Sequence, residues 1–433
     1  MDEPNLPASQ DIKQLTVDID EEKASASVTE RDTVTPETSE KVKFSPPPDG
    51  GFRAWMCIVG GWLVLFCTFG FSTSFGVFQD YYETAGAADS STISWIGSLQ
   101  LFLTFGIGLV SGKWYDEGYF RIMSIIGTFL IALALFMLSI CDPSKYYGLI
   151  LTQGVVMGIG NGLLITPTLS IQSQYWDKKL GLALGIVQSG SSCGGVVMPI
   201  MLNILFKGKS QFAWGTRAVA ILISGLLVIA SFLMRTRVPG RKAGANAHKE
   251  SVAAIRAAAL DWPYVSYVVG YGRHTFHFYL PIWTRLHGMS DSLAFYTIAI
   301  LNAGSVFGRI GPNTLGDHVG PFNVLIPMCY ASGALVFAMF GVTNIPAVVI
   351  VSFLYGFTTG SSAECIKVSV GNHLGNARTL SVRLGILFFL TAFSDLFGTP
   401  IQGALLGPEN TFWYKGILFS AVRHPYPYKQ AVS

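Results

Sequence analysis

The sequence predicts an all-α polytopic membrane protein. Of its 433 residues, 50% are hydrophobic and only 13% are charged, against roughly 25% charged in a soluble domain. About eleven long apolar stretches separated by short loops lie between residues 54 and 403. Most Lys and Arg residues of these loops fall on alternate connections, as expected when every second loop faces the cytoplasm. Little of the chain is left for a soluble enzyme, so transport across a bilayer is the favoured class of function.

Residues 1–48 form a polar segment before the first apolar stretch. They contain 11 acidic and 5 basic residues, whereas the rest of the chain contains 15 and 24. This segment holds too little apolar surface to offset the entropy lost on ordering. We expect a disordered acidic cytoplasmic tail that serves as a tether or, alternatively, as a phosphorylation segment. The chain does not open with the apolar run of a secretory signal, so the first span is expected to direct its own insertion.

Two sets of apolar stretches have about the 20 residues that a helix needs to cross a bilayer. The first set comprises residues 54–77, 91–112, 122–141, 147–171, 180–205 and 214–234, and the second comprises 262–283, 292–312, 322–342, 345–368 and 380–405. The last piece, 411–422, reaches only about 18 Å at 1.5 Å per residue, so we expect the twelfth span to be truncated or replaced. The predicted domains are therefore a first bundle at 49–234, a cytoplasmic linker at 235–260, a second bundle at 261–422 and a short polar tail at 423–433. Two six-helix halves are typical of secondary transporters.

The basic residues of the short loops predict the orientation. With the amino terminus inside, Lys113, Arg121, Lys178 and Lys179 all lie on cytoplasmic connections, and the linker adds six more basic residues. We therefore expect a cytoplasmic amino terminus. The plasma membrane is the expected location, with the vacuolar membrane as the alternative.

Several motifs resemble one transporter family. Asp49-Gly50-Gly51-Phe52, directly before the first span, resembles the DGG-aromatic signature of the monocarboxylate porter family within the major facilitator superfamily. Residues 175–185 (YWDKKLGLALG) resemble the aromatic, basic and Gly-rich start of that family's fifth span, and 293–309, 316–323, 354–357 and 398–401 resemble its fungal branch. The resemblance covers roughly residues 47–406. It implies the major facilitator fold of two six-helix bundles.

Acidic residues recur at corresponding places in the two halves. Asp116 and Arg121 lie in the loop after the second span, and Asp317 follows the eighth span, as expected of an internal repeat. The resemblance implies that such loop carboxylates pair with basic residues and helix ends in one conformation; ordinary loop charge is the alternative. The residues to which we assign conformational gating are Asp49, Asp116, Arg121, Asp177, Lys178, Lys179 and Asp317.

Ionisable groups inside a membrane are costly, so each one is a candidate functional residue. Arg309, near the inner end of the eighth span, could hold a substrate carboxylate in a bidentate fork, although an arginine that snorkels to the cytoplasmic surface is the alternative. Asn302 on the same span is a second candidate for substrate binding, and Asp395 on the eleventh span is the candidate protonatable group. In the animal members of the resembling family an acid precedes this arginine by one turn. Here Ser305 occupies that position, which argues against proton coupling of the animal type.

No motif predicts an enzyme, a cofactor or a metal site. The six cysteines lack paired spacing, and Gly208-Lys209-Ser210 matches only the end of a phosphate-binding loop. In the seventh span His274 and His277 share a face and could titrate near neutrality, unless this segment departs from the family because the sequence was spliced or assigned differently.

These features predict a secondary active or facilitative transporter of a small organic anion or related metabolite, of monocarboxylate type, that works by alternating access. The expected partners are that substrate, a proton as candidate co-substrate and the lipid bilayer, with no nucleic acid and no obligate protein partner. Two alternatives stay open. The chain could export a fungal secondary metabolite, or it could be a membrane sensor that binds such a ligand without transporting it.

Overall fold

The computed structural model describes residues 47–207, 211–238, 284, 289–342, 344–372, 381, 384–393 and 396, which belong to one compact unit, Pro47–Ser433. Within these residues, nine helical stretches are long and apolar enough to cross a membrane. They are Phe52–Thr84, Ser91–Asp116, Phe120–Ile140, Tyr146–Gln174, Leu180–Lys207, Phe212–Leu233, Leu293–Val319, Pro321–Ala338 and Ile345–Ser362. This confirms the predicted first to sixth and eighth to tenth spans. The seventh span and the short piece at 411–422 lie outside the described residues.

The first span is a broken helix made of α2 (Phe52–Cys67), α3 (Phe69–Ser72) and α4 (Phe75–Thr84). Hydroxyl groups at the breaks donate to backbone carbonyls of the preceding turn: Thr68 Oγ1 to Val64 O at 2.7 Å and Thr73 Oγ1 to Gly70 O at 2.7 Å. Such bonds compete with the helical ladder and bend helices. Gly70 of α3 lies against Gly194 of α10, so closely that a Cβ atom on Gly70 would lie 2.6 Å from the Gly194 Cα.

The second to fourth spans contain further irregularities. α5 (Ser90–Gly106) starts at the capping residue Asp89 and is followed by α6 (Gly108–Asp116) and α7 (Phe120–Ile140). The fourth span consists of α8 (Tyr146–Leu149), the π-helix η1 (Ile150–Val156), α9 (Met157–Ser170) and the 3₁₀-helix η2 (Ile171–Gln174). In the π-helix, Gln153 accepts a hydrogen bond from the buried Tyr82 hydroxyl at 2.7 Å. This bond fastens the end of the first span to the fourth.

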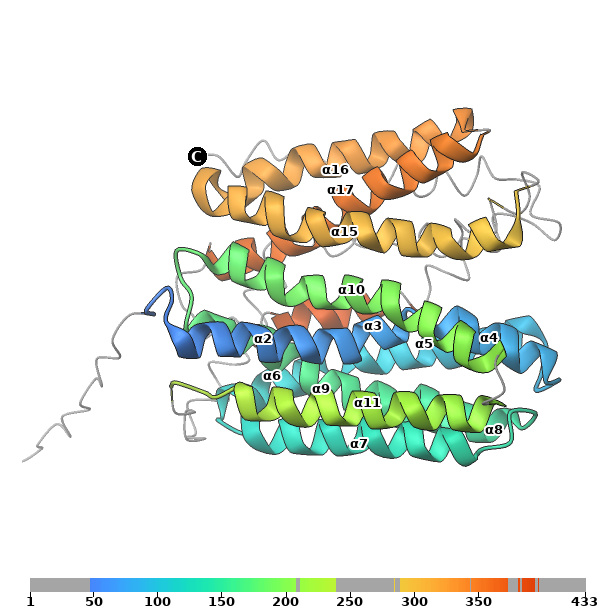
Figure 1. Ribbon diagram of the computed structural model, residues 1–433. Helices are drawn as coiled ribbons and strands as arrows, with labels where there is room; N and C mark the ends of the chain where they lie inside the picture. Colours follow the sequence, from blue (N-terminus) through green and yellow to red (C-terminus); the bar gives the residue numbers. More distant parts are fainter. Residues whose placement is uncertain are drawn as a thin grey trace, which may run out of the picture. The chain divides into compact units, whose positions relative to one another are not determined.

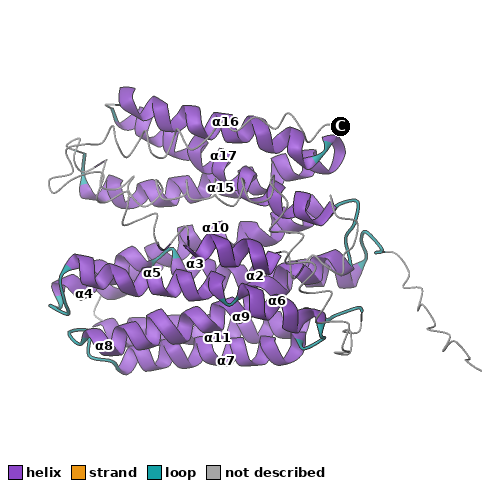
Figure 2. Cartoon of the chain, turned by 180° about the vertical axis from the view of Figure 1, so that it is seen from behind, coloured by secondary structure: helices purple, strands orange, loops and turns teal. Residues whose placement is uncertain are grey.

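α10 (Leu180–Lys207) lies between two groups of helices (Figures 1 and 2). On one side it packs against α2 and α3, and α11 (Gln211–Leu233) packs against α7. On the other side it packs against α15 (Asp291–Val319), which groups with α16 (Pro321–Ala338), the short η4 (Met339–Gly341) and α17 (Ile345–Asn372). Gly304 and Gly308 of α15 face the α17 backbone at Phe353 and Phe357 with no room for a Cβ atom. Small residues spaced by four thus allow these two helices to touch.

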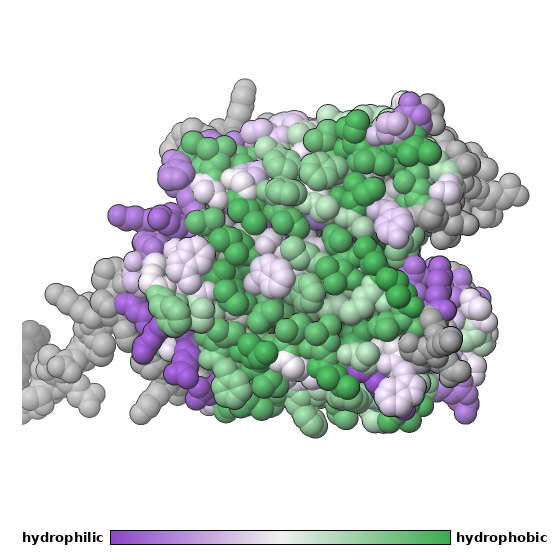
Figure 3. Space-filling model, viewed as in Figure 1, coloured by the Kyte–Doolittle hydropathy of each residue, from purple (hydrophilic) through white to green (hydrophobic). Residues whose placement is uncertain are grey.

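The surface has the pattern of a membrane protein. The face in Figure 3 is a broad apolar band, with hydrophilic residues gathered at its two ends. Exposed aromatic residues, which favour the boundary between membrane and water, lie near both ends of the spans. Phe52, Trp55, Trp114 and Tyr119 lie near the end that carries Asp49, and Trp95, Tyr147, Trp214 and Tyr296 lie near the other. We call these the Asp49 end and the Tyr147 end.

The structure corrects the predicted positions of two acidic residues. Asp116 and Asp317 were expected in loops, but Asp116 is the last residue of α6, and α15 continues through Asp317 to Val319. α15 ends there because Gly320 adopts φ +93°, a left-handed conformation that stops a helix and favours glycine. Both carboxylates are therefore held on rigid helix ends.

Candidate functional site: the contact between the two halves

The first half of the chain (residues 49–234) contacts the second half (from residue 289) where α10 packs against α15. At the Asp49 end of this contact, the Asp317 carboxylate accepts hydrogen bonds from the backbone N–H groups of Gly181 and Leu182, each at 2.8 Å. The first N–H groups of a helix lack acceptors within it and carry partial positive charge. Asp317 therefore caps α10 from the opposite half. Gly181 is required because a Cβ atom there would lie 2.7 Å from the Asn313 carbonyl oxygen.

A second carboxylate binds the same segment from the amino-terminal side. Asp49 Oδ1 accepts from the backbone N–H groups of Asp177 at 2.7 Å and Lys179 at 3.4 Å, and the Asp49 N–H donates to Tyr175 O at 3.0 Å. The side chains of Asp177, Lys178 and Lys179 are exposed. The contacts of this segment with Asp49 therefore use its backbone, whereas the sequence drew attention to its charged side chains.

Asp116, the last residue of α6, makes a corresponding contact with the second half. Its carboxylate accepts a hydrogen bond from the hydroxyl group of Ser381, a buried residue of the second half. Arg121 is exposed in the first turn of α7. Among the described contacts of Asp116, none is with Arg121. The two acidic residues predicted at corresponding places thus both reach across to the other half at the Asp49 end.

Arg309 and Asn302 lie deeper in the contact between α10 and α15. The Arg309 guanidinium donates from Nη1 to Gln188 O at 3.0 Å and to Ser191 Oγ at 2.9 Å, and its Nε donates to Ser305 Oγ at 3.1 Å. Asn302 Nδ2 donates to Ile298 O at 3.1 Å and reaches Gly195 O at 3.5 Å. In this conformation the half-buried Arg309 bridges the two halves.

A buried polar network lies within the first half. The Ser72 hydroxyl accepts from Gln100 Nε2 at 2.9 Å and Asn161 Nδ2 at 3.3 Å, and donates to Thr68 O at 3.0 Å. Asn161 Oδ1 is buried and has no hydrogen-bond partner among the described residues. Sequence reasoning missed this network. The signal that could have found it is the presence of two side-chain amides, Gln100 and Asn161, inside otherwise apolar spans.

Thr73, the residue after Ser72, lies beside Gly195 of α10. A Cβ atom placed on Gly195 would lie 3.0 Å from Thr73 Oγ1 and 2.9 Å from the Asn302 Cγ and Nδ2 atoms. The broken first span, α10 and α15 therefore meet at Gly195. Neutral hydrogen-bonding groups from both halves converge there.

Aromatic rings from both halves meet where α5 lies against the helix Leu384–Phe393. The ring centre of Phe105 lies 5.5 Å from that of Phe388, and the ring centre of Phe102 lies 5.5 Å from that of Phe393. Phe388 and Phe393 belong to the helix Leu384–Phe393. Phe69 of α3 lies 5.3 Å from Phe105, which links this aromatic row to the break in the first span. The contact between the halves thus combines amides and hydroxyls with aromatic rings.

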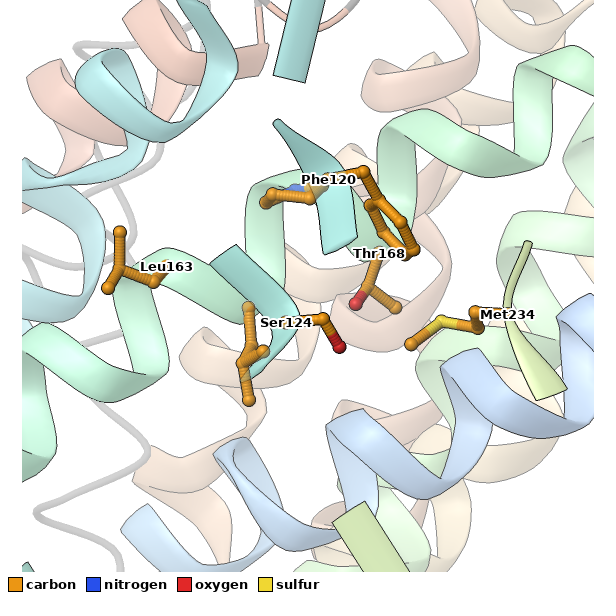
Figure 4. A pocket seen from close by; sticks show the side chains of 7 residues that line it. Phe120, Ser124, Leu163, Thr168 and Met234 are labelled. Carbon is orange, nitrogen blue, oxygen red and sulfur yellow. The ribbon is translucent and has the colours of Figure 1, made fainter. Parts of the chain in front are cut away.

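A separate recess lies at the Asp49 end of the first half, among α7, α9 and the end of α11. Its lining comprises Phe120, Ser124, Leu163, Leu164, Pro167, Thr168 and Met234 (Figure 4). The recess is small, with about 150 Å³ of empty space that includes open solvent. Its size and its position within one half argue against a role as the substrate site.

The structure leaves some predicted functional residues undescribed. Asp395, His274 and His277 lie outside the described residues, so their roles stay predictions. Among the described residues, no group of three or more His, Cys, Asp and Glu side chains could hold a metal ion.

Residues 60–399 match the model of the Major Facilitator Superfamily. The chain belongs to this superfamily. It is 36% identical to the aspyridones efflux protein apdF of Emericella nidulans over 384 residues, which cover 87% of this chain and 77% of that protein. It is 34% identical to the agnestins efflux protein AgnL12 of Paecilomyces divaricatus, over 89% of this chain and 88% of that protein.

A solved structure supports the same fold. The human organic anion transporter MFSD10 (TETRAN) aligns with a TM-score of 0.66 over 88% of this chain and 100% of that one, at 15% sequence identity. These comparisons confirm the predicted superfamily and all-α fold, with fungal transporters as relatives. The chain is an integral multi-pass membrane protein and a major facilitator superfamily transporter.

Proposed function

We propose that this transporter exports an organic secondary metabolite by alternating access. The names of the relatives apdF and AgnL12 support efflux of such compounds and favour this alternative over the monocarboxylate-like anion that the motifs suggested. The observation that carries the proposal is that neutral groups and aromatic rings from both halves meet at their contact: Thr73 and Asn302 meet at Gly195, and Phe102 and Phe105 pack against Phe393 and Phe388.

The residues at this contact favour a particular substrate chemistry. Asn302 offers an amide group, Thr73 offers a hydroxyl group, and the neighbouring rings are aromatic. The network inside the first half adds the amides of Gln100 and Asn161 and the hydroxyl of Ser72, the residue before Thr73. Sites of this kind bind ligands mainly through apolar and aromatic contact, and a few polar groups fix the orientation. The expected substrate is therefore a ring-containing compound with hydroxyl or amide groups and no obligatory charge.

The structure represents one state of the proposed cycle. α10 contacts α15 from Gly181 to Gly195, and the second span contacts the helix Leu384–Phe393 and Ser381 from Phe102 to Asp116. Each of these two contacts starts at the Asp49 end and extends along about 21 Å of helix, at a rise of 1.5 Å per residue. The basic loops support a cytoplasmic location for this end. Loading of an exported compound then requires the Asp49 end to open and Asp317 to leave α10.

A second candidate substrate is an organic anion, and Arg309 favours it. Its guanidinium is bound to neutral oxygens of Gln188, Ser191 and Ser305. When the halves separate, the donors that now bind Gln188 and Ser191 lose these acceptors, and a guanidinium can bind a carboxylate in a bidentate geometry.

Metabolite profiling tests both candidates. The ratio of extracellular to intracellular concentration is measured for many compounds in cells that produce secondary metabolites and carry the wild-type chain, the Arg309→Ala variant, the Asn161→Ala variant or no chain. We expect a neutral ring compound whose export requires the chain and falls with Asn161→Ala more than with Arg309→Ala. Export of a carboxylate that Arg309→Ala abolishes would favour the organic anion instead. If no compound depends on the chain, the export proposal is wrong.

A further inference from the structure

A single arginine interrupts the lipid-facing surface of α11. Arg217 lies between Trp214, which is 65% exposed, and Ile221, which is 64% exposed, at spacings of three and four residues that place them on one face of the helix. A charged side chain on the lipid-facing surface of a span is costly unless it finds a polar partner. The surroundings of Arg217 therefore indicate what that partner is.

The protein supplies Arg217 with only part of a binding environment. The guanidinium carbon lies 5.0 Å from the centre of the Trp214 ring, and Nε donates to Ser139 Oγ at 3.4 Å. Neither α7, which carries Ser139, nor α11 contains an Asp or Glu residue. Among the described residues, no carboxylate lies within ion-pair distance of Arg217. A cation–π contact and one hydroxyl group hold the guanidinium, but its charge lacks an anion in the described part of the chain.

The depth of Arg217 matches the phospholipid headgroups. It is the sixth residue of the span Phe212–Leu233, about 8 Å from its first residue at 1.5 Å per residue. Ser139 belongs to the last turn of α7, and Tyr147, 85% exposed, lies just beyond the same end. Exposed Trp and Tyr residues favour the headgroup level, and an arginine side chain spans the remaining distance to it.

We propose that Arg217, Trp214 and Ser139 bind the phosphate group of a phospholipid in the leaflet at the Tyr147 end. A guanidinium fork matches phosphate oxygens in charge and geometry. The Trp214 ring engages one face of the guanidinium and the Ser139 hydroxyl engages Nε. The phosphate is therefore expected to bind the terminal nitrogens. The bound lipid contacts α7 and α11 together. The position of the site between exposed Trp214 and Ile221 selects a lipid headgroup over a dissolved phosphate ion.

Native mass spectrometry of the purified full-length chain tests this site. The delipidated protein is titrated with phosphatidylglycerol, with diacylglycerol of the same acyl chains and with inorganic phosphate. We expect tight binding of phosphatidylglycerol only. Arg217→Gln is expected to weaken it roughly ten- to a hundredfold, the factor that hydrogen bonds to charged groups represent. Lys145→Gln, which removes an exposed basic residue at the same end, is the matched control and is expected to bind normally.

Three results would overturn the proposal. These are equal phosphatidylglycerol affinity in wild type and Arg217→Gln, diacylglycerol binding as tight as that of phosphatidylglycerol, and inorganic phosphate binding of comparable strength. Should Arg217→Gln elute as an aggregate, Arg217→Lys replaces it. That variant keeps the charge and loses the planar fork, so we expect weaker phosphatidylglycerol binding than in wild type, and unchanged binding would contradict the proposal.

Discussion

Replacing Asp317 with alanine is expected to open the Asp49 end. The substitution removes both acceptors of the Gly181 and Leu182 N–H groups, whose hydrogen bonds to Asp317 measure 2.8 Å each. No other group of α15 is expected to reach these donors, because Asp317 lies in the last turn before Gly320 ends the helix. Because Asp317 and Leu182 are only half-buried, water replaces part of these bonds in the closed conformation and solvates the donors fully once the halves separate. The substitution therefore acts on the closed conformation and leaves the open one almost unchanged.

The free energy that Asp317→Ala removes from the closed conformation can be worked out from the two hydrogen bonds of Asp317. Hydrogen bonds to a charged group contribute about 1.5–3 kcal/mol each when buried, but Asp317 is only half-buried. Loss of a helix-capping side chain costs about 0.5–2 kcal/mol. A combined loss of about 2 kcal/mol shifts the equilibrium between closed and open conformations roughly 30-fold. Asp317→Asn keeps one acceptor oxygen and is expected to give a smaller shift.

Pulsed electron spin resonance measures this opening directly. Spin labels are attached at Lys113→Cys in the first half and Val319→Cys in the second, in a chain whose six natural cysteines are replaced by serine. Both sites are exposed at the Asp49 end. We expect Asp317→Ala to add or enlarge a population with a longer distance between the labels.

Asp142→Ala is the matched control for this experiment. The Asp142 carboxylate also accepts from a backbone N–H, that of Ser144 at 3.0 Å, but this bond stays within one loop at the Tyr147 end. Its removal is expected to leave the label distances unchanged. An identical distance distribution in wild type and Asp317→Ala would refute the role of Asp317 as a cap that holds the halves together.

Three further predictions concern single residues. Gly185→Leu places a side chain against the backbone carbonyl of Arg309, so we expect the Asp49 end to stay open in the same spin-label experiment and export to fall. Asp49→Ala removes the acceptor of two backbone N–H groups. We expect it to lower the free energy of unfolding of the purified chain by about 1 kcal/mol and therefore its melting temperature; an unchanged melting temperature would contradict this. Hydrogen bonds from Thr92 lower the pKa of Asp89 below its usual range, so its charged cap stabilises the start of α5 at neutral pH and the stabilisation is lost as the pH falls through that lowered pKa. Hydrogen exchange at the start of α5 should therefore rise at acid pH in the wild type and be raised already at neutral pH in Asp89→Ala.

Much of the fold could be predicted because hydropathy reports directly on lipid exposure and helix burial. The six stretches of the first half and three of the second appear as helices close to their expected bounds. The breaks in the first span could not be predicted. They coincide with Thr68, Ser72 and Thr73, whose hydroxyl groups donate to the helix backbone, and a hydroxyl group inside an apolar run is equally compatible with an unbroken helix.

The candidate site was predictable only in part. The internal repeat led to Asp116 and Asp317, and the structure brings both against the opposite half. The partners of Asp317 could not be inferred, because a backbone N–H at a distant helix start carries no side-chain signature, and Ser381 is one of many serines that could have met Asp116. A substrate contact of Arg309 stays a prediction; in this conformation its donors reach Gln188 and Ser191 on another helix. The meeting of α10 with α15 is a tertiary property that one sequence does not reveal.

A disulfide across the closed contact tests most directly whether transport requires the Asp49 end to open. Asp116→Cys and Ser381→Cys, at two side chains that are hydrogen-bonded across the halves, are introduced into the cysteine-free chain. Flux of the exported compound is then measured in vesicles before oxidation, after oxidation and after reduction. We expect oxidation to stop flux and reduction to restore it. Undiminished flux through fully cross-linked protein would contradict transport by separation of the halves at this end.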